Sequence, residues 1–239
     1  MIFETFRVNR ILRSVHRIPS HVAVILDGNR RYAAKHGLSA VDGHRKGAET
    51  TFNFAQWAQD IGITHLTLYA FSTENFQRSA DEKKGLKDIF LNEFLRLVED
   101  QRLSEYQVRV SLLGDRSLIS PDLLVAIEAL EEKTRSFSRY HVHIAIAYGG
   151  RHEIVSVASH MSTSPITPDA LTDALYPVGS MPDVHLLIRS AGESRISNFL
   201  PWLAFGNECV FCSIRRTWPE IRRYDMAKAL KKYSDAFQE

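Results

Sequence analysis

The stretch 21-HVAVILDGNRRYAAKHG-37 changes from an apolar run to charged and small residues within one position. Its first part, 21–26, is short and rich in aliphatic and β-branched residues, which is typical of a strand buried on both faces. Asp27 follows directly, and Arg30 and Arg31 come soon after. Ligands of α/β proteins bind beyond the carboxyl ends of parallel strands. We therefore expect Asp27 and the two arginines to face a ligand.

Five further segments resemble the first strand, and helical patterns lie between them. The other predicted strands are 65–71, 108–114, 141–149, 184–189 and 208–214, and the predicted helices are 45–62, 81–103, 121–137, 151–161 and 168–176. Wholly apolar strands that alternate with helices indicate a parallel sheet covered on both faces. We predict an α/β fold with a single domain, in which a mainly parallel six-stranded sheet is flanked by helices.

The composition excludes several functions. The 239 residues are 44% hydrophobic and carry a formal net charge of +2, too small an excess to favour nucleic acid as a partner. No apolar run is long enough to span a membrane and no signal peptide opens the chain, so we expect a cytoplasmic protein. Cys209 and Cys212 lie in one apolar run without a second ligand pair, and we expect free thiols.

The carboxyl end of each of the first five predicted strands carries an arginine, and the fifth carries two. These arginines are Arg31, Arg78, Arg116, Arg151, Arg189 and Arg195. A single arginine at a strand end is more often a solvated loop residue, but five strands that end alike favour one cleft for a polyanion. Arginine suits phosphate because its planar fork donates two parallel hydrogen bonds and stays charged. Glycines at 28, 149, 150 and 192 are expected to let backbone N–H groups reach the same oxygens.

The type of anion follows from the motifs that the sequence lacks. Neither a P-loop pattern nor a dinucleotide fingerprint is present, so we expect a diphosphate. Asp27 then has two interpretations. It can simply neutralise the arginines, or it can bind the Mg²⁺ that accompanies a diphosphate, since Mg²⁺ needs only one or two carboxylates from a protein.

Two helical segments carry more apolar residues than a core-facing stripe needs. These are 52–58 and 86–98, the second of which contains Phe90 and Phe94. Ordinary core packing explains both segments, and so does a hydrocarbon slot beside the diphosphate site. The pattern alone leaves both interpretations open.

Several blocks of the sequence resemble the cis-prenyltransferases, the undecaprenyl diphosphate synthase family. The resemblance is carried by HVAVILDGNRRYA, GHRKG, LTLYAFSTENFQR, YGGR and LLIRSAGESRISNFLPW, followed by NECVF and TWPE, and covers about residues 18–224. It implies an apolar tunnel and a homodimer. It also implies an Mg²⁺-dependent condensation of isopentenyl diphosphate with an allylic prenyl diphosphate, which gives a longer Z-configured polyprenyl diphosphate.

The resemblance assigns roles to individual residues. Asp27 matches the family's metal-binding aspartate, and Glu208 matches a glutamate near the dimer contact that helps to hold magnesium. Ser72 and Asn75 match residues assigned to proton removal and to orienting the substrates. The substrate-binding residues that it implies are Gly28, Asn29, Arg30, Arg31, Tyr32, His44, Ser72, Thr73, Glu74, Phe76, Arg78, Arg189, Arg195, Ile196 and Ser197.

The chain also departs from the family's pattern. Ala40 stands where bacterial members have an arginine, and Ser194 where many members have a histidine. Arg30 replaces the glycine of bacterial long-chain synthases, and we expect it to compensate for Ala40. Two alternatives stay open: a prenyltransferase of the same fold with a different acceptor or an irregular coupling, and a non-catalytic partner subunit. The intact Asp27 argues against the second.

Residues 1–17, MIFETFRVNRILRSVHR, mix apolar side chains with four arginines. This basic amphipathic pattern is typical of a helix that lies on an anionic membrane surface, and also of a helix packed on its own domain. We treat 1–17 as an appended segment and 18–239 as the catalytic domain, with peripheral membrane contact as one interpretation of the segment.

Overall fold

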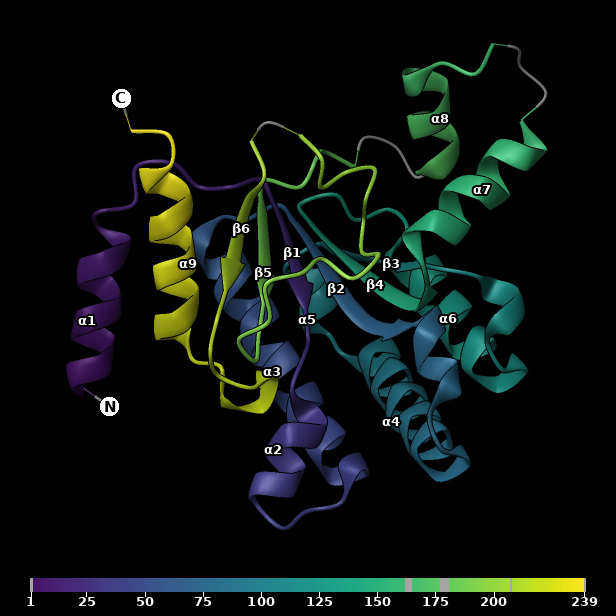
Figure 1. Cartoon of the computed structure of the whole chain (residues 1–239), viewed down its shortest axis with the longest axis horizontal. Helices are drawn as coiled ribbons and strands as arrows, with labels where there is room; N and C mark the ends of the chain where they lie inside the picture. The colour runs from purple at the N-terminus through teal and green to yellow at the C-terminus, as the bar shows by residue number, and fades with distance from the viewer. Residues whose placement is uncertain (1, 162–164, 177–180, 207, 239) are drawn as a thin grey trace.

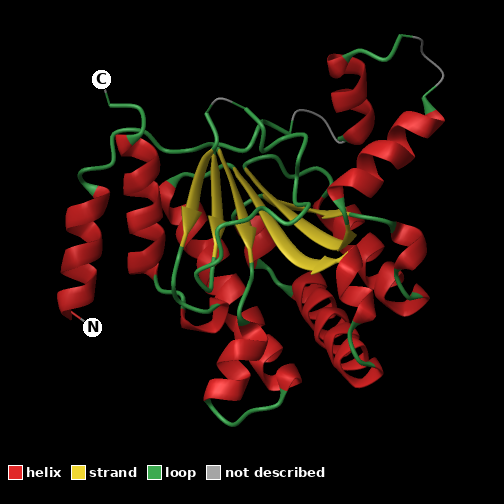
Figure 2. Cartoon of the chain, viewed as in Figure 1, coloured by secondary structure: helices red, strands yellow, loops and turns green. Residues whose placement is uncertain are grey.

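The central sheet has six strands, all of them parallel, and helices flank it (Figure 1, Figure 2). The computed structural model describes residues 2–161, 165–176, 181–206 and 208–238. The strands are β1 His21–Ile25, β2 His65–Ser72, β3 Val108–Leu113, β4 Tyr140–Tyr148, β5 Leu186–Arg189 and β6 Val210–Ser213. The predicted parallel α/β sheet is therefore confirmed.

The strand order places β1 at the point where the sheet topology reverses. The order is β3-β4-β2-β1-β5-β6, so the chain leaves β1 toward β2 on one side and later returns to β5 on the other. All five residues of β1 are buried. In open α/β sheets the ligand crevice lies at such a switch point, beyond the carboxyl ends of the strands. Asp27 follows β1 directly and so lies at this crevice.

Helices cover the two faces of the sheet unequally. The helices are α1 Ile2–Leu12, α2 Asn29–Lys35, α3 Ala40–Ile61, α4 Ala80–Glu99, α5 Arg102–Glu105, α6 Pro121–Thr134, α7 Gly150–His160, α8 Pro168–Leu175 and α9 Arg223–Asp235. Short 3₁₀ turns are η1 Thr73–Gln77, η2 Arg116–Leu118 and η3 Trp218–Glu220. One face packs against α3, α4, α6 and α9. The other packs against α7, α8 and irregular residues on either side of β5, which include Met181, Val184, Phe199, Leu200 and Leu203.

Two helices fall outside the predicted helical segments. Residues 29–35 belong to none of the predicted elements, but they form α2. It also contained no prediction for α9, whose buried side chains include Met226, Leu230 and Tyr233. Lysines occupy the outer side of α9 and interrupt the apolar periodicity of its sequence. The two cysteines are free, as expected.

Histidines pair across the amino ends of three strands. His21 of β1 lies opposite His65 of β2, which lies opposite His141 of β4. The Nδ1 atom of His65 is 3.2 Å from Nε2 of His143, whose other nitrogen is 2.6 Å from the Ser111 hydroxyl. Burial, with a smaller effect of His141, lowers the pKa of His65 to about 4. His65 is therefore neutral in the folded protein at pH 7.

We predict that acid destabilises the fold by protonating these paired histidines. Between about pH 6.5, the ordinary histidine pKa, and about pH 4, the unfolded chain protonates His65 but the folded protein does not, so the free energy of unfolding falls as pH falls. Urea denaturation at pH 7 and pH 5 measures this loss. A His65→Ala variant should lose less stability between the two pH values than the wild type or a His160→Ala control. Equal losses in all three proteins would contradict the prediction.

Candidate active site

A cleft of about 780 Å³ lies beyond the carboxyl ends of β1, β2 and β5. Twelve predicted residues line it: Asp27, Gly28, Asn29, Arg30, Arg31, His44, Ser72, Glu74, Asn75, Arg78, Arg189 and Ser197. They come from the turn after β1 and the start of α2, from α3, from the end of β2 and the turn after it, and from the end of β5 and the loop that follows. The structure thus brings together residues that are up to 170 positions apart, since Asp27 and Ser197 share one cleft.

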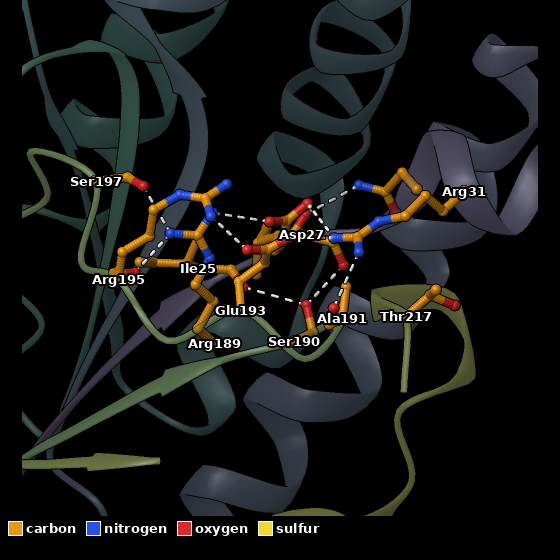
Figure 3. Close-up of polar contacts among 12 residues, drawn as sticks. Ile25, Asp27, Arg31, Arg189, Ser190, Ala191, Glu193, Arg195, Ser197 and Thr217 are labelled. Carbon is orange, nitrogen blue, oxygen red and sulfur yellow. Dashed lines mark hydrogen bonds and ion pairs between the residues drawn. The ribbon is translucent and has the colours of Figure 1, made fainter. Parts of the chain in front are cut away.

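An ion pair between Asp27 and Arg189 forms the centre of this cleft (Figure 3). Nη2 of Arg189 donates to Oδ2 of Asp27 at 2.9 Å, and Nη2 of Arg31 lies 3.4 Å from Oδ1. Burial raises the pKa of Asp27, but the hydrogen bond and charge of Arg189, with help from Arg31, outweigh it and bring the pKa below its ordinary value. Asp27 therefore stays anionic at neutral pH.

Arg189 also holds the loop that follows β5. Its side chain is 6% exposed, and Nη1 donates to the Ser197 hydroxyl at 2.6 Å and to the carbonyl oxygen of Arg195 at 2.5 Å. Ser197 and Asn198 have left-handed backbone conformations, with φ of 47° and 59°. Such conformations cost energy in residues other than glycine and persist where surrounding contacts impose them. Arg189 supplies two of these contacts.

The backbone of the Asp27–Gly28 turn is held from behind. The carbonyl oxygen of Asp27 accepts from the Ser190 hydroxyl at 2.7 Å and from the Trp218 N–H at 2.9 Å. Gly28 has φ of 99°, and a Cβ there would lie 2.8 Å from Ala191 Cβ and 2.9 Å from Thr217 Cβ. Only glycine fits both the conformation and the space.

The turn after β2 orders Ser72 and Asn75 by mutual capping. The Ser72 side chain accepts from the Asn75 N–H, and Oδ1 of Asn75 accepts from the Ser72 N–H at 3.2 Å. The Asn75 oxygen is therefore occupied, and the amide nitrogen that remains is a donor. This geometry favours an orienting role for Asn75 over proton removal.

Glu82 is a cleft-side residue that the sequence analysis missed. Its buried carboxylate Oε1 lies 3.0 Å from Nη1 of Arg78 and 3.2 Å from Nε2 of His44, and Oε2 lies 3.9 Å from Nε of Arg30. Glu82 thus gathers three predicted substrate-binding side chains. The spacing of Ser79 and Glu82 is typical of a helix start. This capping pattern explains Glu82 in the sequence, so its contacts with the cleft residues were not predicted.

Six predicted residues do not line the cleft: Tyr32, Thr73, Phe76, Arg195, Ile196 and Glu208. The Tyr32 ring packs on His36, and Phe76 lines a separate apolar cavity of about 160 Å³. Arg195 reaches the site only through its carbonyl oxygen, because its side chain pairs with Glu193. Glu193 also lies 3.5 Å from Arg31, and it was not among the predicted residues.

Glu208 lies at the other end of the sheet. It precedes β6 and binds Arg17 at 2.7 Å, whereas Asp27 follows the carboxyl end of β1. Within one chain the structure therefore does not bring the two predicted metal ligands together. Across the described ranges, no group of three or more histidine, cysteine, aspartate or glutamate side chains is arranged to hold a metal ion. Asp27 is the predicted ligand that remains in the cleft.

The prediction that arginines from five strands share one cleft is wrong for two of them. Arg116 follows β3 at the sheet edge, beyond β4, and pairs with Glu131 at 2.7 Å. Arg151 is exposed and does not line the cleft. The expected phosphate contact of Gly150 is also wrong, because its N–H already donates to the Asn198 carbonyl oxygen at 2.9 Å. The sequence marks strand ends but not their order in the sheet.

An apolar cavity of about 300 Å³ adjoins the polar cleft. It lies between α3, α4 and the sheet, and its lining includes Phe52, Ala55, Leu86, Ile89, Phe90, Phe94, Val110, Val142 and Ile144. Both apolar segments singled out in the sequence thus contribute to one cavity. Leu26, Asn29, His44 and Ala70 line the cleft and the cavity alike. The site can therefore hold an anionic group and a hydrocarbon chain side by side.

Comparison with known proteins agrees with such a site. The Prenyltransf family model, for undecaprenyl diphosphate synthases, matches residues 25–238. A tritrans,polycis-undecaprenyl-diphosphate synthase (geranylgeranyl-diphosphate specific) of Archaeoglobus fulgidus is 40% identical over 242 residues, which cover 97% of this chain and 96% of that protein. An isoprenyl transferase of Thermus thermophilus is 39% identical over 239 residues, covering 94% and 90%.

The solved structures give the same result. The crystal structure of lavandulyl diphosphate synthase from Lavandula x intermedia, in complex with dimethylallyl diphosphate, matches with a TM-score of 0.81. It is 29% identical and covers 93% of this chain and 98% of its own. The fold and site define a transferase of prenyl groups. The chain belongs to the undecaprenyl diphosphate synthase family, the cis-prenyltransferases, which confirms the resemblance found in the sequence.

No helix within the described part of the chain is both long and apolar enough to cross a membrane.

We predict that Gly28→Ala damages the protein more than Gly62→Ala. Both glycines have a positive φ, 99° and 95°, so alanine costs about 1–2 kcal/mol at either position. Only at Gly28 does the new Cβ also meet atoms closer than 3 Å, whereas nothing lies within 4 Å at Gly62. Chemical denaturation of the two variants measures the difference. Equal losses of stability would show that the close packing around Gly28 is not limiting.

Proposed function

We propose that this chain condenses isopentenyl diphosphate with an allylic prenyl diphosphate to give a longer Z-configured polyprenyl diphosphate, with Mg²⁺ as cofactor. The observation that carries the proposal is the wall shared by the arginine-lined cleft and the apolar cavity. An allylic substrate would place its diphosphate in the cleft and its hydrocarbon chain in the cavity. On this proposal, the cavity is the start of the product tunnel.

The charged residues of the cleft divide between the two substrates. We assign Arg30, Arg31 and His44 to the allylic diphosphate, and Arg189 and Ser197 to the diphosphate of the isopentenyl unit. Asp27 fits Mg²⁺, because it is an anionic oxygen ligand and this ion needs few of them from a protein. When bound, Mg²⁺ neutralises charge that develops on the leaving diphosphate.

The cleft brings the two substrates together, and its residues assist the removal of a proton. Holding both substrates in one cleft turns a bimolecular encounter into a near-attack arrangement, in which the allylic C–O bond breaks and a C–C bond forms. A proton must then leave the adjacent carbon of the former isopentenyl unit. Asn75 is a poor base whose oxygen is already occupied. The released diphosphate is the base that can keep this proton, and it takes the proton directly or through the Ser72 hydroxyl as a relay.

Relatives suggest the primer and the main alternative. The name of the Archaeoglobus fulgidus enzyme specifies geranylgeranyl diphosphate, and we propose the same allylic primer here. The similarity to lavandulyl diphosphate synthase keeps an irregular coupling or another acceptor as the second candidate. Mass spectrometry of the products formed with several primers distinguishes the two. A non-catalytic partner subunit would form no product on its own.

We predict that Asp27→Asn lowers product formation about 10³-fold, because Mg²⁺ loses its anionic ligand. The assay follows labelled isopentenyl diphosphate into prenyl product with geranylgeranyl diphosphate and Mg²⁺. An Asp173→Asn variant, changed at an exposed position of α8, serves as the matched control and should retain activity. Activity of Asp27→Asn close to that of the wild type would refute the assignment of Asp27.

We also propose a homodimer. The helix α7 supports this, because only Gly150 among its eleven residues is buried and Val155 is 68% exposed. A second copy of the chain would cover the exposed side of α7, which carries Val155. Light scattering should give twice the chain mass of 27.2 kDa, and the mass of a single chain would refute the dimer.

We propose further that α1 contacts an anionic membrane surface, as the basic segment 1–17 suggests. The helix packs on α9 with Val8, which is 3% exposed, whereas Phe6 on the opposite side is 68% exposed. Arg10 and Arg13 are exposed on the same outer side, a combination of apolar and basic residues that suits an anionic lipid surface.

We predict that replacing Arg10 and Arg13 together by glutamate reduces sedimentation with phosphatidylglycerol vesicles and leaves product formation in detergent unchanged. The charge reversal removes attraction to the anionic headgroups. An Arg135→Glu variant at the end of α6 is the control. Membrane binding that the charge reversal does not weaken would refute the contact.

A further inference from the structure

Asn198 links three separate strand ends around the cleft. Its Nδ2 lies 3.3 Å from Oε1 of Glu74, in the turn after β2. Its Oδ1 accepts from the N–H of Arg151 at 2.9 Å, and its carbonyl oxygen accepts from the N–H of Gly150 at the same distance, both at the start of α7 after β4. Asn198 itself belongs to the loop after β5. One residue therefore connects the ends of β2, β4 and β5.

The partners of the Asn198 amide fix its orientation. A backbone N–H requires the amide oxygen, so the nitrogen is left to donate to the Glu74 carboxylate. Space for this arrangement comes from Gly149, where a Cβ would lie 2.7 Å from the Thr73 hydroxyl and 3.3 Å from Nδ2 of Asn198. The two glycines after β4 thus serve close packing around Asn198.

The neighbours of Asn198 connect it to both halves of the cleft. Ser197 binds Arg189, which pairs with Asp27. On the other side, Phe199 is fully buried and stacks on Tyr69 with ring centroids 4.4 Å apart. A shift of Asn198 would therefore move the turn after β2 relative to the arm formed by Arg189 and Ser197.

Resting on the proposed function, we infer that Asn198 is a positioning residue, which aligns the turn carrying Ser72, Asn75 and Arg78 with the Arg189–Ser197 arm through its hydrogen bond to Glu74. The two diphosphates would bind on opposite sides of this link. The residue acts through Glu74 and itself contacts neither reacting atom.

The test uses Asn198→Gly, because glycine tolerates the φ of 59° and only the side-chain bonds are lost. We expect kcat to fall about tenfold, the effect of one hydrogen bond to a charged group, while KM changes little because every diphosphate ligand is still present. Asn198→Asp keeps an acceptor for the Arg151 N–H but cannot donate to Glu74, and should be at least as slow. A normal rate for Asn198→Asp would overturn the role of Glu74.

Two further measurements separate positioning from a general loss of structure. In a Glu74→Ala background, Asn198→Gly should cost little more, since the link is already broken; a full additional tenfold loss would overturn the inference. Amide hydrogen exchange of the free protein should speed up at residues 72–78 in Asn198→Gly. The control is Gln107→Gly, another left-handed position, with φ of 52°, at the amino end of β3. It should leave exchange at 72–78 unchanged.

The hydrogen-exchange measurement tests the positioning role of Asn198 without any catalysis. If the wild-type chain formed no prenyl product with any primer, the proposed function would fail. Faster exchange at 72–78 in Asn198→Gly would still support the positioning role, and unchanged exchange would overturn it.

Discussion

The ion pair between Asp27 and Arg189 is the interaction on which the site depends. It exists because β1 and β5 are parallel neighbours, with Ile25 opposite Arg189, so the residue two positions beyond Ile25 meets the last side chain of β5. The pair is partly buried, with side-chain exposures of 28% and 6%. Without a ligand the two charges satisfy each other. On the proposed function, the substrates would offer each of them a new partner: the Mg²⁺ of the allylic diphosphate for Asp27, and oxygens of the isopentenyl diphosphate for Arg189.

The second constraint on the site is that the polar cleft and the apolar cavity adjoin but remain separate surfaces. Asn29 stands at their boundary: its Nδ2 donates to the Leu26 carbonyl oxygen at 3.1 Å, and its buried Oδ1 has no partner among the described residues. Gly47 on α3 makes room for it, because a Cβ there would lie 2.3 Å from this oxygen. A buried acceptor without a donor costs free energy, which a bound substrate could recover.

Much of the fold could be predicted from the sequence, because apolar runs such as 21–26 are dictated by burial on both faces of a parallel sheet. Asp27 and Arg189 were found from their places at strand ends, and motif resemblance supplied His44 and Ser72. The strand order was not predictable in this way. The prediction therefore placed Arg116 in the cleft wrongly, since β4 separates its strand from β2.

Other residues were missed because their local sequence has a simpler explanation. Glu82 is typical of a helix start, although its carboxylate turns toward Arg78 and His44. Asn198 carries no signal of its own beyond its place in the SNF triplet. Its role comes from contacts to Glu74 and Arg151, which lie 124 and 47 positions away.

The central claim is that Asp27 would hold the Mg²⁺ that accompanies a diphosphate in the cleft. Calorimetric titration of inorganic diphosphate into the protein, with and without Mg²⁺, tests it most directly, because no catalysis is involved. We predict that Mg²⁺ strengthens binding to the wild type and has little effect on Asp27→Asn, which should bind free diphosphate at least as well as the wild type because one negative charge is gone. The same Mg²⁺ enhancement in both proteins would contradict the account.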